Sequence, residues 1–344
     1  MRLGDLATLL GARLLGDADV DGAIDIVGLK NVAEAGVGHV GFVAHAHERQ
    51  AAFSTGASAL LVDLDFAAEH AHELPCPVLV ADVPSVALRL AIEALHPIPV
   101  TPSAGRHPSA VVAASAVVGS DVVLGAGVVI EDGVVVGDGC VLGPHVVLRH
   151  GVRLGQGVRI GPGTVVGDDG FVFDDDGVPI RPVASVVIDD GVWLGANVAV
   201  DRGLLRDTRI GRDCRIDNLV QVGHDVVIGA NVVVVAQVGI AGYVTIGDGV
   251  TIAGQAGVNP HVRIAAGVRV GGQAGVTNDV DVTGAVVAGT PAFLHHEWLK
   301  AMARLKHLDA TERRLRAAER TLARLAPSPA SPASSTTSTT RDPP

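Results

Sequence analysis

A six-residue aliphatic period runs through the middle of this chain. Positions six residues apart hold Val118, Leu124, Ile130, Val136, Leu142, Leu148, Leu154, Ile160 and Val166, and most are followed by glycine. A period of six matches neither the roughly 3.6 residues of a helical turn nor the alternation of a simple strand. It is typical of a repeat in which each hexad forms one side of a coil and its aliphatic side chain points inward.

The regular period begins at Val112, ends at Val282 and is interrupted twice, at residues 167–187 and 201–209. A stray residue within a coil would turn every later inward side chain outward, so both interruptions are expected to leave the coil as loops. In repeat proteins such loops commonly lie on the binding face. With three hexads to a coil, roughly 26 hexads predict a triangular prism on the order of 40 Å long.

The segments that flank the repeat have different compositions. Residues 1–100 mix apparent helices with short apolar strands and predict a small α/β domain. Residues 101–291 hold the repeat, and residues 292–325 have leucines at helical spacing. Residues 326–344 are rich in Ser, Thr, Pro and Ala, and we expect them to be disordered. In the first segment we predict helices at 3–14 and 85–95 and strands at 59–62 and 78–80.

The composition also excludes several classes of protein. A formal net charge of −11 argues against nucleic acid as the main partner. No apolar run approaches the roughly 18 residues that a membrane-spanning helix needs. The first residues are charged and lack an export cleavage pattern, which predicts a cytoplasmic protein. Cys140 and Cys214 fall on inward positions of the repeat, so we interpret them as buried small hydrophobes and not as disulfide partners or metal ligands.

A candidate catalytic stripe lies on the outside of the predicted prism. His224 comes two residues after the inward Val222, so it should face outward, and histidine is the usual general base near neutral pH. One coil of 18 residues further along the chain is Gly242, and one coil beyond that are Pro260 and His261. A base next to an unobstructed backbone N–H suits acyl transfer, because the N–H can stabilise the oxyanion of the tetrahedral intermediate.

Two further features of the sequence leave alternatives open. His145 and His150, with His107, could form a zinc site between chains, but His107 is 38 residues from His145 and not two full coils, which favours no metal. The segment 292–325 carries an excess of basic residues. Arg304, Lys306, Arg313 and Arg314 either belong to a solvated helix face or dock an acidic partner, and the residues alone favour the solvated face.

Six segments of the chain carry a resemblance to known proteins: Ile216–Gly229 (IDNLVQVGHDVVIG), Gly163–Phe173 (GTVVGDDGFVF), Val198–Gly211 (VAVDRGLLRDTRIG), Val235–Val258, Leu29–Val43 and Gly56–Val62. They resemble segments of one family of enzymes, the UDP-3-O-acylglucosamine N-acyltransferases of the lipid A pathway. The similarity covers roughly residues 1–325. The hexad repeat alone is shared by many acyl- and acetyltransferases, whereas the segment around His224 together with its flanking loops and end domains is specific.

The resemblance implies a left-handed parallel β-helix that assembles as a homotrimer, with active sites between neighbouring chains and a uridine-binding N-terminal domain. It implies that His224 is the general base, that the amide of Gly242 serves the oxyanion, and that His261 is a second active-site histidine. The acyl donor would be a 3-hydroxyacyl thioester on acyl carrier protein, which the basic C-terminal helices would meet. No metal or redox cofactor is needed. We take Phe42, His45, Asp217 and Gln221 as candidate substrate-binding residues, and Gln273 or Gly275 as candidates for the end of the acyl groove.

The chain departs from the family pattern in its N-terminal segment and beside His224. Where the family commonly has Phe-x-x-Asn-Pro-x-Tyr, this chain has Phe42, His45, Ala46 and Glu48, so the predicted nucleotide pocket lacks an aromatic residue that would stack on uracil. Asp225 replaces the usual Asn; an Asp beside the catalytic His is more typical of the sister O-acyltransferase, where it can orient the imidazole. Two alternatives therefore stay open: a related acyltransferase with another amino- or hydroxy-sugar acceptor, and a non-catalytic β-helical binding module.

Overall fold

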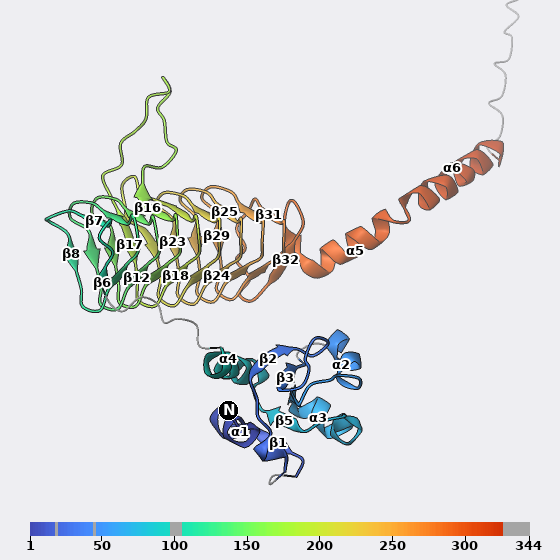
Figure 1. Cartoon of the computed structure of the whole chain (residues 1–344). Coiled ribbons are helices and arrows are strands. Elements are labelled where there is room, and N and C mark those ends of the chain that lie inside the picture. The colour runs from blue at the N-terminus through green and yellow to red at the C-terminus, as the bar shows by residue number, and fades with distance from the viewer. Residues whose placement is uncertain (18–19, 44–45, 97–104, 326–344) are drawn as a thin grey trace, which may run out of the picture. The chain divides into compact units, whose positions relative to one another are not determined.

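The computed structural model describes residues 1–17, 20–43, 46–96 and 105–325 of the chain. His45 and the expected disordered tail, residues 326–344, lie outside this part. The chain divides into two compact units, Met1–Ser103 and Ala104–Pro344, and each is described by itself (Figure 1).

The N-terminal unit is an α/β domain built on a five-stranded sheet of order β1-β5-β4-β3-β2. The strands are β1 (Arg13–Leu15), β2 (Gly28–Asn31), β3 (His39–Phe42), β4 (Ala59–Asp63) and β5 (Val78–Ala81), and only β1 runs antiparallel to its neighbour. The helices are α1 (Leu3–Leu10), α2 (Ala46–Ala52), α3 (Leu64–His70) and α4 (Pro84–Leu95), with short 3-10 turns at Asp21–Ala23 and Ala71–Glu73. Apolar side chains of the sheet pack into two clusters, one with α1 and α4 and the other with α3.

One helix of this unit is shorter than the sequence pattern predicts. The helix expected over residues 3–14 ends at Leu10, because Gly11 adopts a left-handed φ of 60° and its N–H bonds back to the carbonyls of Ala7 and Thr8. Residues Arg13–Leu15 then pair with β5 as an antiparallel strand. The apolar residues after the glycine were therefore wrongly assigned to the helix.

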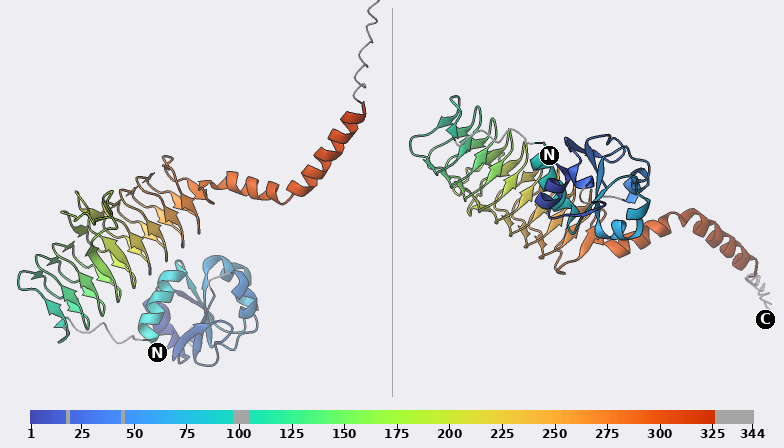
Figure 2. Two further views of the ribbon diagram at one scale, coloured as in Figure 1. Left: turned by 90° about the horizontal axis from the view of Figure 1, so that it is seen from above. Right: turned by 60° about the horizontal axis from the view of Figure 1, so that its bottom comes forward.

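The C-terminal unit is a parallel β-helix whose three walls are separate sheets (Figure 2). Strands pair with strands 18 residues further along the chain where the coil is uninterrupted, as in Val129 with Val147. The nine-stranded wall contains β7 (Val111–Val112), β10 (Val129–Ile130), β13 (Val147–Leu148), β16 (Val165–Asp168), β19 (Ala199–Asp201), β22 (Gln221–Val222), β25 (Gly239–Ile240), β28 (Gly257–Val258) and β31 (Gly275–Val276).

The other two walls follow the same rule, except that the last two strands of the eleven-stranded wall pair antiparallel. The eight-stranded wall contains β8 (Val117–Val118), β11 (Val135–Val136), β14 (Arg153–Leu154), β17 (Val186–Ile188), β20 (Thr208–Ile210), β23 (Val227–Ile228), β26 (Thr245–Ile246) and β29 (Arg263–Ile264). The eleven-stranded wall contains β6 (Gly105–Arg106), β9 (Val123–Leu124), β12 (Val141–Leu142), β15 (Arg159–Ile160), β18 (Trp193–Leu194), β21 (Arg215–Ile216), β24 (Val233–Val234), β27 (Thr251–Ile252), β30 (Arg269–Val270), β32 (Val286–Ala288) and β33 (Phe293–Leu294).

The interior of the β-helix is filled by the aliphatic residues of the period. From Ile130 to Val276 the inward side chains form one continuous buried cluster, and Cys140 and Cys214 belong to it as free thiols. Burying each Val, Leu or Ile contributes about 1.5–3 kcal/mol, which is why the period fixes the fold. The prediction fails at both ends. Val118 falls on the period but is 36% exposed and lies outside the core cluster. Val282 is 63% exposed, and Val280 packs on the core in its place because the chain leaves the hexad register after Val276.

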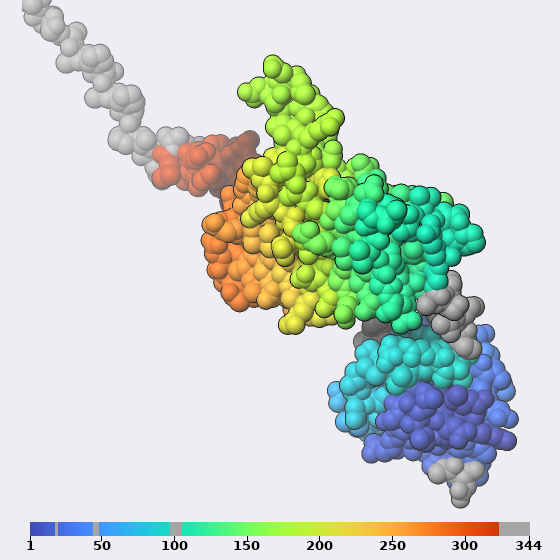
Figure 3. All heavy atoms as spheres, turned by 90° about the vertical axis from the view of Figure 1, so that its left-hand side faces the viewer, coloured from blue at the N-terminus to red at the C-terminus, as the bar shows by residue number. Residues whose placement is uncertain are grey.

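Both insertions leave the prism at the same corner, where the chain passes from the nine-stranded to the eight-stranded wall. The first joins β16 to β17 and the second joins β19 to β20. The next turn at this corner, between β22 and β23, holds His224, and we call it the His224 corner. The first insertion stands out from the body of the prism (Figure 3). It folds back on itself, since Ile180 N–H donates to the carbonyl of Val172.

Two helices follow the β-helix. They are α5 (His295–Leu305) and α6 (Leu308–Leu325), and together they match the helical segment expected at 292–325. Across the described residues, no helix is both long enough and apolar enough to cross a bilayer.

Candidate active site

His224 lies on the outside of its corner, directly against Gly242. Its side chain is 15% exposed. A Cβ atom placed on Gly242 would come 2.6 Å from His224 Nε2 and 2.8 Å from its Cε1. The two residues are on adjacent rungs, since Tyr243 N–H donates to the His224 carbonyl at 3.0 Å. The 18-residue spacing therefore brings the imidazole over the glycine backbone, and only glycine leaves room for it.

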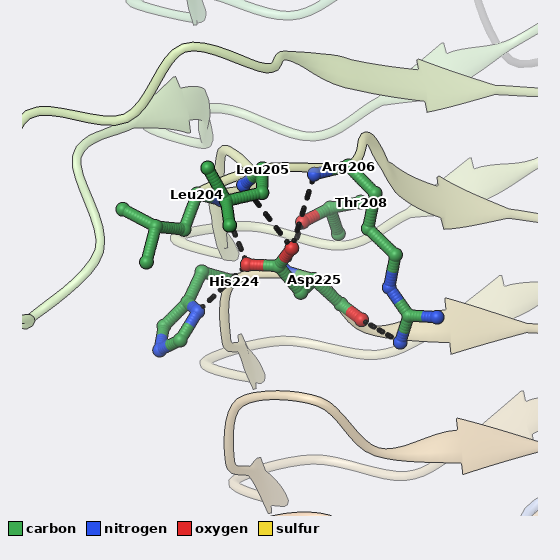
Figure 4. Close-up of polar contacts among 6 residues, drawn as sticks. All are labelled: Leu204, Leu205, Arg206, Thr208, His224 and Asp225. Carbon is green, nitrogen blue, oxygen red and sulfur yellow. Dashed lines mark hydrogen bonds and ion pairs between the residues drawn. The ribbon is translucent and has the colours of Figure 1, made fainter.

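Asp225 is buried behind His224 and holds its other ring nitrogen. The carboxylate is 1% exposed, and its Oδ2 lies 2.9 Å from His224 Nδ1 (Figure 4). Burial raises the pKa of Asp225, but hydrogen bonds from His224 and from the backbone amides of Leu204, Arg206 and Leu205 outweigh it, so the pKa lies below its ordinary value. An ionised carboxylate only accepts hydrogen bonds, so Nδ1 carries the proton and Nε2 is left free to accept one.

The second insertion builds the cradle of this carboxylate. The amides of Leu204, Leu205 and Arg206 donate to the Asp225 carboxylate at 2.7, 3.4 and 3.2 Å (Figure 4). Arg206 Nη2 also donates to the Asp225 carbonyl at 2.8 Å, and Thr208 Oγ1 accepts from the Asp225 N–H at 2.9 Å. This loop turns too tightly for a side chain at its start, because a Cβ on Gly203 would lie 1.6 Å from the Arg206 carbonyl oxygen.

The N–H of Gly242 has no hydrogen-bond acceptor among the described residues. At two turns elsewhere in the prism, the N–H at the corresponding position is taken up by a carboxylate from the next rung, whereas at Gly254 and Gly272 it has no acceptor among the described residues either. Ala230 N–H donates to Asp248 at 2.8 Å, and Ser120 N–H donates to Asp138 at 2.7 Å. Below Gly242 the next rung carries Pro260, which has no acceptor in its side chain. The stripe therefore offers an unpaired donor beside a free imidazole nitrogen, as an oxyanion site requires.

The two insertions also shape the surroundings of the imidazole. A Cβ on Gly170, in the first insertion, would lie 3.0 Å from His224 Cβ and Cδ2, so this glycine backbone packs against His224. Asp201 is at the start of the second insertion, one rung from His224. Burial raises the pKa of Asp201 to about 6, against the opposing effects of a hydrogen bond from Gln221 and the charge of His224. The corner thus holds a second, weakly acidic carboxyl group.

Tyr243 and His261 continue the stripe beyond Gly242. The ring centroids of His224 and Tyr243 are 5.0 Å apart with an interplanar angle of 88°, and those of Tyr243 and His261 are 4.8 Å apart at 3°. The structure therefore places His261 on the stripe with His224 and inserts a tyrosine between the two.

Next to the stripe, the outer face of the nine-stranded wall is bare backbone over β25 and β28. Cβ atoms on Gly239 and Gly257 would meet no other atom within 4 Å. Gly275 continues this glycine track on β31, where Thr290 closes it: a Cβ there would lie 2.9 Å from Thr290 Cγ2. A ladder of glutamines borders the track on the side away from His224, with Gln255 donating to Gln237 at 2.8 Å and Gln273 to Gln255 at 2.9 Å.

The remaining candidate residues lie in different places. Gln221 is exposed on β22 beside Asp201, close to the stripe. Asp217 lies at another corner, between the eleven-stranded and nine-stranded walls, where it accepts from the amides of Asn218 and Ala236. It borders a surface groove of about 390 Å³ that also contains Trp193. Phe42 is half-buried at the end of β3 and packs on the core of the N-terminal unit.

The structure also bears on the metal and docking candidates. Over the described part of the chain, no three His, Cys, Asp or Glu side chains are grouped so that they could hold a metal ion. The four basic residues proposed for docking, Arg304, Lys306, Arg313 and Arg314, are all exposed.

Sequence reasoning missed four features of this corner: the amides of residues 204–206, Gly170, Asp201 and Tyr243. Tyr243 could have been found, because it is 18 residues before His261. The contacts of the two insertions could not, since their residues follow no repeat.

Known transferases share the hexad repeat of this chain. Residues 133–168 and 207–242 match the family model described as bacterial transferase hexapeptide (six repeats). The chain is 36% identical to the UDP-3-O-acylglucosamine N-acyltransferase of Pseudomonas syringae pv. syringae (strain B728a), over 94% of this chain and 95% of the relative. It is 50% identical to the protein of the same name from Anaeromyxobacter sp. (strain K), but that match spans only 42% of this chain and 41% of the relative.

Among solved structures, a UDP-N-acetylglucosamine acyltransferase from Francisella novicida is similar in fold, with a TM-score of 0.51 and 26% identity. The similarity covers 58% of this chain and 73% of that structure. The hexad repeat and the nearly full-length match to the Pseudomonas protein lead to one conclusion: this chain belongs to the UDP-3-O-acylglucosamine N-acyltransferase family.

Proposed function

We propose that this protein transfers a 3-hydroxyacyl group from acyl carrier protein to the 2-amine of UDP-3-O-(3-hydroxyacyl)glucosamine, with His224 as the general base. One observation supports this above the others: His224 Nδ1 is held by the buried Asp225, while Nε2 lies beside the unpaired N–H of Gly242. A general base and an oxyanion donor on the same small surface are what acyl transfer needs.

The reaction follows from these positions. His224 Nε2 removes a proton from the acceptor amine as the nitrogen attacks the thioester carbonyl, and the N–H of Gly242 donates to the oxyanion that forms. When the tetrahedral intermediate collapses, the C–S bond breaks and the amide remains. The imidazolium then returns its proton to the leaving thiolate. Asp225 stabilises the imidazolium in the interval by its negative charge and keeps the ring in the productive tautomer.

The glycine track supports an acyl substrate. It begins next to the His224 stripe, and its bare backbone at Gly239 and Gly257 leaves a smooth surface on which a hydrocarbon chain can lie. Thr290 ends the track at Gly275, about 10 Å from Gly239 if the rungs have the usual strand spacing. We propose that a homotrimer covers this track and that the exposed basic residues of α5 and α6 bind the acidic carrier protein.

The test is an acyl-transfer assay with the full-length protein, 3-hydroxyacyl-acyl carrier protein and UDP-3-O-(3-hydroxyacyl)glucosamine, with the amide product detected by mass spectrometry. We expect His224→Ala to lower kcat by about 10³-fold or more, since the other groups of the site retain only part of the rate enhancement. A folded His224→Ala protein that is as active as the wild type would contradict the mechanism.

A second acceptor class is favoured by one observation, the buried Asp225 in place of the family's usual Asn. An Asp–His pair provides a stronger base, which a hydroxyl nucleophile needs more than an amine does. The same assay with a UDP-sugar that offers only a free hydroxyl separates the two candidates, because the proposed function predicts product only from the amine.

A further inference from the structure

Tyr243 is the only tyrosine of the chain, and it occupies the centre of the His224 stripe. Its ring meets the His224 ring edge to face at 5.0 Å and stacks on the His261 ring at 4.8 Å. The chain has nine aromatic residues in all, Phe, Trp and Tyr together. A chain so poor in aromatic residues places one between the two histidines of its candidate active site.

The backbone of the corner imposes this geometry. Tyr243 and His261 have the same left-handed conformation, each with a φ of 63°, at equivalent turn positions one rung apart. Their side chains therefore leave the prism in the same direction, and the spacing between rungs, about 4.8 Å, equals the separation of the stacked rings. On the rung of His224, the position equivalent to Tyr243 is occupied by Asp225. His224 comes one residue before Asp225, so its ring approaches the Tyr243 ring from the side.

Hydrogen bonds along the rungs keep these residues in register. Tyr243 N–H donates to the His224 carbonyl at 3.0 Å, and His261 N–H donates to the Gly242 carbonyl at 3.1 Å. The His224 ring is thus confined on each side: Asp225 holds Nδ1, Gly170 and Gly242 pack against the ring, and Tyr243 limits its rotation. Among the described residues, Tyr243 is the only aromatic residue whose ring contacts the His224 ring.

We propose that Tyr243 is a positioning residue of the acyl-transfer site, whose ring fixes the distance and tilt between the His224 and His261 imidazoles. The proposal rests on the function given above. It assigns this role to the ring and not to the phenol hydroxyl, for which the described residues provide no hydrogen-bond partner. The consequence is that a residue without an aromatic ring at this position lowers the rate of the chemical step and leaves acceptor binding almost unchanged, because the acceptor amine still binds but meets a misplaced base.

The experiment compares Tyr243→Ser with Tyr243→Phe in the full-length protein. The control is Asn231→Ser, which makes a similar change at a left-handed turn position, φ 56°, of a different corner. We expect Tyr243→Ser to lower kcat by about 10- to 100-fold with an acceptor KM within about 3-fold of the wild type, and Tyr243→Phe to stay within about 2-fold in both. Thermal unfolding should be alike for Tyr243→Ser and Asn231→Ser, which separates positioning from loss of fold.

Crystal structures of the two Tyr243 variants provide a readout that does not depend on turnover. We expect the His224 and His261 rings to move or to become multiply oriented in Tyr243→Ser and to keep their places in Tyr243→Phe. Unmoved rings in Tyr243→Ser, or an unchanged kcat, would overturn the proposal, as would a Tyr243→Phe protein that is as slow as Tyr243→Ser. If the wild-type protein transfers no acyl group, the proposed function fails, and the crystal structures still decide whether Tyr243 holds the two rings.

Discussion

Replacing Asp225 with Asn tests the coupling between the second insertion and the catalytic histidine. Two donors converge on Oδ2 of the carboxylate, Leu204 N–H at 2.7 Å and His224 Nδ1 at 2.9 Å. Two longer hydrogen bonds, from the backbone amides of Leu205 and Arg206, reach Oδ1. An asparagine keeps only one acceptor oxygen, so its amide group must face at least one donor with a donor of its own. The position is 1% exposed, so water cannot relieve this conflict.

The size of the effect follows from these contacts. Leaving a buried donor unsatisfied costs about 1–3 kcal/mol, and the remaining bonds lose the extra strength of a charged acceptor. We therefore expect Asp225→Asn to lower the free energy of unfolding at pH 7 by about 2–4 kcal/mol. Because the imidazolium loses its buried counter-charge, kcat should fall by about 10²-fold or more.

The pH dependence gives an independent check. The pKa of Asp225 is lowered in the folded protein, so its contribution to stability is present above the ordinary carboxyl pKa of 3.8 and is lost as the pH falls through the lower folded value. The difference in stability between wild type and Asp225→Asn should therefore shrink below about pH 4. Urea unfolding at pH 7 and pH 3.5 measures it, and acyl-transfer kinetics measure kcat.

A matched control is Asp248→Asn, since Asp248 also accepts from a backbone amide, that of Ala230 at 2.8 Å, but is exposed at another corner. It should change the free energy of unfolding by no more than about 1 kcal/mol. If Asp225→Asn were as stable and as active as Asp248→Asn, the reasoning that the loop amides and His224 require a charged acceptor would be refuted.

Three further changes test other parts of the site. Gly242→Ala should displace the imidazole, because the new Cβ would lie 2.6 Å from His224 Nε2, and kcat should fall by about 10²-fold. The control is Gly36→Ala, where a Cβ meets no other atom within 4 Å, and its kcat should stay near that of the wild type. Asp201→Asn should stabilise the protein above pH 6 by about 2–3 kcal/mol and leave its stability nearly unchanged at pH 4. The folded pKa of Asp201 is raised from 3.8 to about 6, so the wild type loses stability as the pH rises between those values. Thermal unfolding measured against pH tests this difference between the two proteins. Gly257→Met should block the glycine track half-way and shorten the preferred acyl chain by about four carbons, measured by competition between donors of different length.

The hexad period was sufficient to predict the β-helix and most of its core. Each inward residue is chosen by one physical requirement, the burial of an aliphatic side chain, and outside the two insertions this requirement repeats every six residues from Leu124 to Val276. The prediction failed at Val282, where the register had ended but an aliphatic residue still fell on the period. In the N-terminal unit, a single left-handed glycine, Gly11, ended a helix that the apolar pattern continued.

The same arithmetic placed part of the site. Because residues 18 apart lie on adjacent rungs, the positions of His224, Gly242 and Pro260 in one column follow from their numbers alone, and His261 is the residue after Pro260. The period also identifies the corner at which both insertions emerge, because each insertion begins at the same position of the coil as the turn that holds His224. What the spacing leaves open is the direction in which each side chain points within the corner.

The sequence by itself therefore determined the prism and the column that carries the candidate base. Only the tertiary structure decided that the Asp225 carboxylate accepts from the amides of residues 204–206, that Gly170 packs against the imidazole, and that the Gly242 N–H is left unpaired. The reason is physical: a repeat transmits position through a fixed rise per rung, whereas a loop has no period, and its contacts depend on where its whole path returns to the prism.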